Sequence, residues 1–65
     1  DVLKEREIEF IKLACTELTY KEIANEMCLS PKTIDGYREH LFAKLEVKTR
    51  IGLVLFAIKN RIIML

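Results

Sequence analysis

Residues 18–34 read LTYKEIANEMCLSPKTI, and this stretch decides the fold. Thr19 and Glu22 have the spacing of a capping box, in which each side chain accepts a hydrogen bond from the other residue's amide. Ser30 is a favoured N-cap, and Pro31 after it loses no hydrogen bond at the first helical position. Two helices joined by a tight turn are therefore predicted, which is the helix-turn-helix arrangement.

The apolar residues on either side of this stretch recur at helical spacing, and no run alternates as a strand would. The pattern predicts a first helix over about residues 4–16 and a second that ends near Met27. A third helix is expected from Pro31 to about Leu45, and a fourth begins near Arg50. The sequence thus predicts an all-α fold of four helices in one domain, residues 1–65.

Length and composition fit such a domain. A chain of 65 residues has room for one core, and 51% hydrophobic with 32% charged residues is typical of a folded protein with a solvated surface. Lys59 and Arg61 interrupt the richest apolar stretch, so no run reaches the roughly 18 residues of a membrane span. The chain begins with Asp1 and shows no signal peptide, so we expect a cytoplasmic protein and a piece excised from a longer one.

Few residues suit a metal or a catalytic centre. Cys15, Cys28 and His40 lack the close spacing of a structural zinc site, so no metal and no cofactor is expected. The two cysteines fit either a disulfide or a pair of reduced thiols, and a cytosolic location favours the thiols. One histidine, no carboxylate pair in a plausible pocket and no glycine-rich phosphate loop argue against an enzyme.

Charge is distributed unevenly along the chain. Residues 1–30 carry four basic and seven acidic side chains, whereas residues 31–65 carry seven basic and three acidic ones. The second half can present a positive face to phosphates. Ordinary scatter of surface charge fits the same numbers equally well.

The predicted third helix has two distinct faces at about 100° per residue. An apolar seam, expected to pack on the domain, consists of Ile34, Leu41 and Leu45 with Tyr37 and Phe42 on its shoulders. The opposite face carries Lys32, Gly36, Glu39, His40 and Ala43, with Asp35 at its margin. Glycine in an exposed helix costs roughly 1 kcal/mol relative to alanine. Gly36 therefore indicates either close approach of another surface, such as a DNA major groove, or a neutral position.

The polar side chains of this helix suit DNA with one exception. Lysines can reach phosphates, and His40 and Tyr37 can donate to phosphates or base edges. Carboxylates are repelled by phosphates and help only by accepting from a cytosine amino group. We therefore expect either Asp35 or Glu39 to read a cytosine and the other to restrain a basic side chain, as Asp35 can do for Arg38 three residues later. The stem of Arg38 is expected to lie over the core.

Four blocks in order carry a family resemblance: LKEREIEFIKL at residues 3–13, LTYKEIA at 18–24, LSPKTI at 29–34 and KLEVKTR at 44–50. They resemble the LuxR-type (NarL/FixJ, GerE) helix-turn-helix domain over essentially the whole chain. The resemblance implies a recognition helix in the third position and dimerisation through the fourth. It also implies the carboxyl-terminal output domain of a bacterial response regulator behind a receiver domain, or of a quorum-sensing regulator behind a ligand sensor.

Position by position, the resemblance implies double-stranded DNA as the partner. Contacts from the third helix fall on Lys32, Thr33, Asp35, Gly36, Tyr37, Glu39, His40 and Lys44. Phosphate contacts fall on Thr19, Tyr20, Lys21, Lys48 and Arg50. Asp35 stands where the family usually has Lys, Tyr37 where it has His, and Glu17 and Glu46 replace family glycines. The target sequence is therefore expected to differ from that of better-matching members.

The predicted fourth helix is apolar on two sides. Ile51, Leu55, Ile58 and Ile62 form one stripe, and a second side carries Leu53, Phe56 and Ala57. A domain of 65 residues cannot bury both sides in one core. The surplus stripe is therefore a candidate homodimer interface, or a contact with the missing amino-terminal receiver or sensor domain.

Two alternatives for the function stay open. Sigma factors contain a DNA-binding region with a similar helix and turn, but that pattern does not require Val47-x-x-Arg50 followed by an apolar helix, so the LuxR-type interpretation is preferred. A protein-interaction module on the same scaffold, in which Asp35 and Glu39 reject DNA, is the other alternative. It differs in its response to salt, because phosphate contacts weaken steeply as salt rises.

Overall fold

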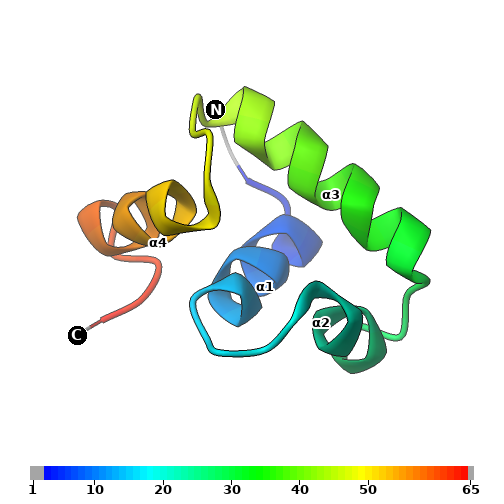
Figure 1. Cartoon of the computed structure of the whole chain (residues 1–65). Coiled ribbons are helices and arrows are strands. Elements are labelled where there is room, and N and C mark those ends of the chain that lie inside the picture. The colour runs from blue at the N-terminus through cyan, green and yellow to red at the C-terminus, as the bar shows by residue number, and fades with distance from the viewer. Residues whose placement is uncertain (1–2, 65) are drawn as a thin grey trace.

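The computed structural model describes residues 3–64, which form four helices and no strand (Figure 1). Helix α1 spans Glu5–Ala14, α2 spans Tyr20–Glu26, α3 spans Pro31–Lys44 and α4 spans Arg50–Lys59. The all-α prediction is confirmed, and α3 and α4 begin at the predicted residues. Helix α1 ends earlier than predicted, at Ala14, with Cys15 as its C-cap. Within residues 3–64, no helix has the length and apolar character needed to cross a membrane.

Local caps explain where the helices begin. The Thr19 hydroxyl accepts from the Glu22 amide at 3.2 Å, and the Glu22 carboxylate accepts from the Thr19 amide at 2.8 Å, which confirms the predicted capping box. Ser30 accepts from the Thr33 amide at 3.1 Å. Thr49, which the sequence analysis did not identify as a cap, accepts from the amide of Gly52 at 3.0 Å. Each such cap contributes about 1 kcal/mol.

Three helices end in the same way, without glycine. The residue after each C-cap of α2, α3 and α4 has a left-handed backbone: Cys28 at φ 58°, Glu46 at φ 57° and Arg61 at φ 58°. The next amide then donates back to the helix, from Leu29 to Ala24, from Val47 to Phe42 and from Ile62 to Ala57. This is the Schellman motif, in which the last of these residues is usually apolar and packs back on the protein. Leu29, Val47 and Ile62 all pack against the core.

This ending corrects the predicted apolar stripe of the fourth helix. Helix α4 stops at Lys59, so Ile62 lies beyond it and not on the stripe of Ile51 and Leu55. The left-handed residue Arg61 turns the chain, and Ile62 packs against the core instead of facing outward. The outward stripe is therefore shorter than predicted.

Helix α1 lies in the middle of the molecule, with α4 on one side and α2 and α3 on the other (Figure 1). Its residues Phe10, Ile11 and Ala14 form the centre of the core. The other three helices, with the C-cap residue of α2, contribute the remaining buried side chains of the core: Ile23, Ala24, Met27, Ile34, Leu41, Leu53 and Ala57. The predicted seam of α3 is confirmed, since Ile34 and Leu41 are fully buried.

Candidate nucleic-acid interface

The outer face of α3 is open to solvent, as the periodicity predicted. Its exposed residues are Lys32, Thr33, Asp35, Gly36, Glu39, His40 and Ala43. Figure 1 shows α3 along one edge of the molecule, joined to α2 by the short turn. At Gly36, a Cβ atom would meet nothing within 4 Å. The domain itself therefore does not require glycine at this position.

The carboxyl-terminal half of α3 is tied to α1 through Glu7. Only 5% of Glu7 is exposed. Its Oε1 accepts from the Lys4 amide at 2.9 Å and lies 3.4 Å from Lys44 Nζ, while Oε2 lies 3.2 Å from His40 Nε2. Sequence reasoning missed this group, because its charged partners lie more than thirty positions away.

Glu7 also defines how α1 begins. Lys4 is the N-cap but its ammonium group accepts no hydrogen bond, so only the Glu7 half of a capping box can form. The bond from the Lys4 amide lowers the pKa of the Glu7 carboxyl below its usual value, and Lys44 and His40 lower it further. Burial opposes them by raising this pKa. Because the net shift is downward, Glu7 is held as a carboxylate facing the inner side of α3.

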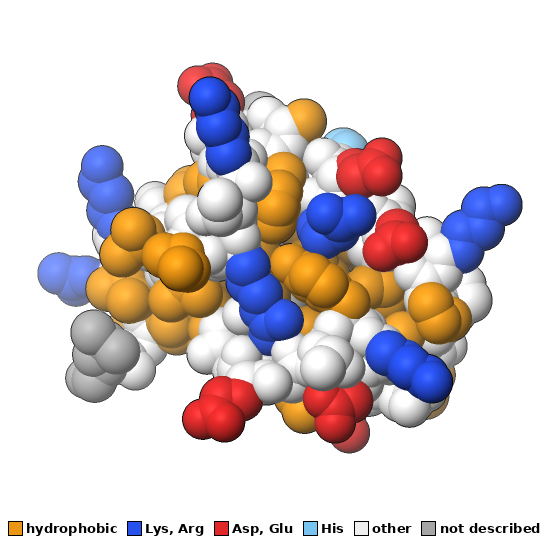
Figure 2. All heavy atoms as spheres, in the orientation of Figure 1, with side chains coloured by type: hydrophobic (Ala, Val, Ile, Leu, Met, Phe, Trp, Pro, Cys, Tyr) orange, Lys and Arg blue, Asp and Glu red, His pale blue; other side chains and the backbone are white. Residues whose placement is uncertain are grey.

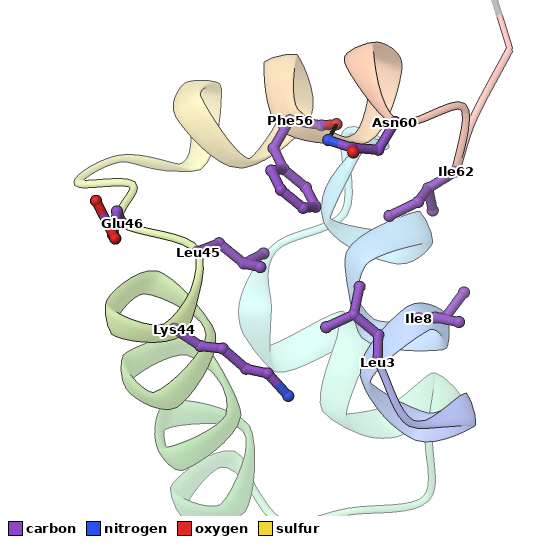
Figure 3. A pocket seen from close by; sticks show the side chains of 8 residues that line it. All are labelled: Leu3, Ile8, Lys44, Leu45, Glu46, Phe56, Asn60 and Ile62. Carbon is purple, nitrogen blue, oxygen red and sulfur yellow. Dashed lines mark hydrogen bonds between the residues drawn. The ribbon is translucent and has the colours of Figure 1, made fainter. Parts of the chain in front are cut away.

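Two residues predicted to contact DNA are engaged with α1. The Lys44 side chain is 22% exposed and extends toward α1 (Figure 3), where its Nζ lies 3.4 Å from Glu7 Oε1. Tyr37 is half-buried, as expected for the shoulder of the seam, and its ring stacks on Phe10 with 6.0 Å between ring centroids. Both side chains thus hold α3 against α1, and their contacts with DNA stay predictions.

Arg38 lies as the sequence predicted, with its stem against the domain. Its Nη2 is 3.9 Å from Asp35 Oδ1, and its guanidinium carbon is 5.6 Å from the centre of the Tyr20 ring. The Arg38 Nε atom is buried and has no hydrogen-bond partner among residues 3–64. The expected restraint of Arg38 by Asp35 is therefore present as a long, partly exposed ion pair.

Arg50 was predicted to contact phosphate, which stays a prediction, and in the structure its side chain has partners within the domain. Nε donates to the Ala14 carbonyl at 2.8 Å, and Nη2 donates to the carbonyls of Thr16 and Leu18. Its guanidinium carbon lies 5.0 Å from the centre of the Tyr20 ring. Arg50 thereby joins the end of α1, the connection to α2 and the start of α4.

The remaining predicted phosphate contacts lie on the surface. Thr19 and Lys21 are exposed at the start of α2, and Lys48 is exposed in the connection between α3 and α4. Tyr20 is half-buried, with its ring stacked on Phe10 at 6.3 Å between centroids. Thus Lys21 and Lys48 lie on elements next to α3, while the exposed face of α3 itself holds Lys32 and two carboxylates.

Figure 2 shows this mixture of charge, with acidic side chains gathered over α3 beside basic ones and the histidine at the upper edge. Acidic side chains outnumber basic ones at a hollow between α1 and α2, which is lined by Glu5, Glu9, Lys12 and Glu26. Phosphates are repelled by that side, so the α3 side is the better candidate for a polyanion.

A groove of about 560 Å³ opens where α1, α3 and α4 meet (Figure 3). Its lining is largely apolar and comprises Leu3, Ile8, Lys44, Leu45, Glu46, Phe56, Asn60 and Ile62. Within residues 3–64, no three His, Cys, Asp or Glu side chains are grouped to hold a metal ion. Cys15 is half-buried and Cys28 exposed, and both are free thiols. Burial raises the pKa of the Cys15 thiol.

Comparison with known proteins agrees with this architecture. The family model described as bacterial regulatory proteins, luxR family, matches residues 1–57. The chain belongs to this family. The luxR-family match spans all four helices except the last two residues of α4. The matched region therefore includes α3, the exposed residues Lys21 and Lys48 on neighbouring elements, and the contacts of Glu7 and Arg50.

Individual relatives are regulators as well. The chain is 35% identical over 60 residues to the response regulator GacA of Pseudomonas viridiflava. The aligned region covers 92% of the chain and 28% of GacA. The chain has the same identity and coverage to GacA of Pseudomonas aeruginosa. It is 32% identical over 62 residues to the oxygen regulatory protein NreC of Staphylococcus carnosus, covering 95% of the chain and 29% of NreC. The chain thus spans less than a third of the length of these relatives.

Proposed function

We propose that this luxR-family domain binds double-stranded DNA sequence-specifically, with α3 in the major groove, and so regulates transcription. The observation that carries the proposal is the exposed face of α3, which follows the tight turn from α2 and on which a Cβ at Gly36 would meet nothing within 4 Å. A helix presented in this way fits a major groove about 12 Å wide. The share of the relatives covered supports the further proposal that the domain is the output part of a longer response regulator.

The contacts of each side chain divide the predicted site residues into two groups. Those exposed and placed to meet DNA are Lys32, Thr33, Gly36 and Glu39 on α3, and Thr19, Lys21 and Lys48 beside it. Those whose side chains are engaged within the domain are Tyr20, Asp35, Tyr37, His40, Lys44 and Arg50. The first group makes the DNA contacts in this proposal, and the second group maintains the structure that presents α3. Asp35 and His40, with side chains 60% and 61% exposed, are the members of the second group that also reach the surface.

A salt titration tests the proposal. Fluorescence anisotropy of a labelled duplex is measured with the wild type, Lys21→Gln, Lys48→Gln and the control Lys12→Gln. Each lost phosphate contact is expected to reduce the slope of log K against log salt by about 1. Lys12 of α1 lines the same hollow as Glu5, Glu9 and Glu26, so its substitution should leave the slope unchanged. No binding at low salt would contradict DNA binding and favour the protein-interaction module.

We further propose that α4 forms a homodimer contact. Ile51 is 73% exposed and Leu55 is 61% exposed, one turn apart on the side of α4 away from the core. Figure 2 shows hydrophobic side chains gathered over α4. A two-fold pair would place two copies of α3 on half-sites about one DNA turn apart.

Sedimentation velocity with and without DNA tests the homodimer. Leu55→Ser should shift the chain toward monomer, while Met64→Ser should not, although Met64 is 82% exposed and equally apolar. A wild type that stays monomeric on DNA would contradict the homodimer. It would favour contact of this stripe with a receiver or sensor domain.

A further inference from the structure

Two carboxylates on the exposed face of α3 need an explanation if α3 enters DNA. Asp35 and Glu39 are four residues apart, so they lie on the same side of the helix, and both are exposed. A carboxylate brought beside phosphates is repelled unless a hydrogen-bond donor compensates it. The donor has to come either from the protein or from a base edge.

The structure separates the two carboxylates by their partners. Asp35 Oδ1 has Arg38 Nη2 at 3.9 Å. Glu39 has no ion-pair or hydrogen-bond partner among residues 3–64. The donors that follow it on α3, His40 Nε2 and Lys44 Nζ, both lie within 3.4 Å of the Glu7 carboxylate. Glu39 is therefore the carboxylate whose donor would have to come from DNA.

The neighbourhood of Glu39 also permits close approach. Gly36 lies three residues earlier on the same face and carries no side chain, and the space beside it is empty within 4 Å. Ala43 lies four residues later, is exposed and adds only a methyl group. Glu39 is thus a long side chain flanked along this face by two small residues, Gly36 and Ala43, so it can extend to a base edge while the helix backbone stays near the groove floor.

We propose that Glu39 determines the sequence specificity of the domain by accepting a hydrogen bond from the N4 amino group of a cytosine in the major groove. Cytosine is the base whose own major-groove edge offers a donor alone, whereas the adenine amino group lies beside the N7 acceptor, which repels a carboxylate. Asp35 instead holds Arg38. This assignment rests on the proposed DNA binding and extends it by naming the base that α3 reads.

Selection from a randomised duplex library tests the assignment. The wild type should enrich sites with a cytosine at one fixed position of the half-site, with a preference of about tenfold over other bases. Glu39→Gln should change that position to adenine, because a glutamine amide can pair with both N6 and N7 of adenine. Asp35→Asn is the matched control and should keep the cytosine. Helical circular dichroism checks that each exposed substitution leaves the fold intact.

The possible outcomes distinguish the role of Glu39 from the proposed DNA binding on which it rests. A wild type that enriches no motif at low salt would contradict sequence-specific DNA binding itself. An enriched motif without the cytosine, or one that Glu39→Gln leaves unchanged, would overturn only the role of Glu39. A cytosine preference that disappears in Asp35→Asn and persists in Glu39→Gln would assign the reading to Asp35.

Discussion

Replacing Arg50 with alanine distinguishes a residue that contacts phosphate from one that holds the domain together. The structure gives Arg50 two part-buried hydrogen bonds, to the carbonyls of Ala14 and Leu18, and an exposed one to that of Thr16. A hydrogen bond of this kind contributes about 1 kcal/mol, and the contact with the Tyr20 ring adds about 0.5–1 kcal/mol. We therefore expect Arg50→Ala to lower the free energy of unfolding by about 3 kcal/mol.

That loss is large for a chain of this size. At roughly 0.05–0.15 kcal/mol per residue, 65 residues have a total free energy of unfolding of about 3–10 kcal/mol. With a urea dependence of about 1 kcal/mol per molar, the midpoint of unfolding should fall by about 3 M. The assay is urea unfolding followed by circular dichroism at 222 nm.

Lys48→Ala is the matched control, because Lys48 is a nearby exposed cation for which no ion pair is found among residues 3–64. Its substitution should change the free energy of unfolding by no more than about 0.5 kcal/mol. Arg50→Lys should recover only part of the lost stability, since one ammonium group cannot reach all three carbonyls in the fixed geometry of a guanidinium. An Arg50→Ala protein as stable as the wild type but with weakened DNA binding would refute this reasoning. It would show that Arg50 acts chiefly by contacting phosphate.

Three further substitutions follow from the structure. Glu46→Gly should raise the free energy of unfolding by about 1 kcal/mol, measured by urea unfolding, because φ at this position is 57° and glycine adopts that conformation without strain. Glu7→Gln should destabilise the domain by about 1–2 kcal/mol at pH 7 by removing the charge between Lys44 and His40. Because folding lowers the pKa of Glu7, the carboxylate stabilises the domain fully above the ordinary pKa of 4.5, and this effect is lost as pH falls through the lower pKa of the folded state. The urea midpoints of the wild type and Glu7→Gln should therefore converge as the pH is lowered. Gly36→Ala should stabilise the free domain by about 1 kcal/mol, since a Cβ meets nothing there, and weaken DNA binding if the groove floor approaches that point; unchanged binding would make Gly36 a neutral position.

The beginnings of the helices and the ends of α2 and α3 could be predicted from sequence to within a residue, whereas the left-handed turns after the helices and the end of α4 could not. Caps such as Thr19 with Glu22 act over three residues, so their signal is local and readable. The ends of α2, α3 and α4 depend on left-handed residues that are Cys28, Glu46 and Arg61 and not glycine. The family resemblance marked Glu46 as the place of a glycine, but nothing marked Arg61, and Ile62 was therefore assigned to the outward stripe.

In the candidate site, too, features that depend on local spacing could be predicted, and features that depend on distant residues could not. Helical periodicity correctly separated the exposed face of α3 from its buried seam, because that division depends only on spacing within one helix. The roles of Lys44 and Arg50 depend on groups 32–37 positions away in the chain. The acceptors of Arg50 are backbone carbonyls, which every residue has, so the sequence carries no sign of them.

The stacking of both tyrosines on Phe10 gives the domain its own optical reporter. The chain has two tyrosines and no tryptophan, so near-ultraviolet circular dichroism arises mainly from Tyr20 and Tyr37, one on α2 and one on α3. Both rings lie against the same side chain of α1, and their signal therefore reports how three helices pack around one point. A variant that keeps its far-ultraviolet helical spectrum but loses this tyrosine signal has retained its helices and lost the geometry that presents α3.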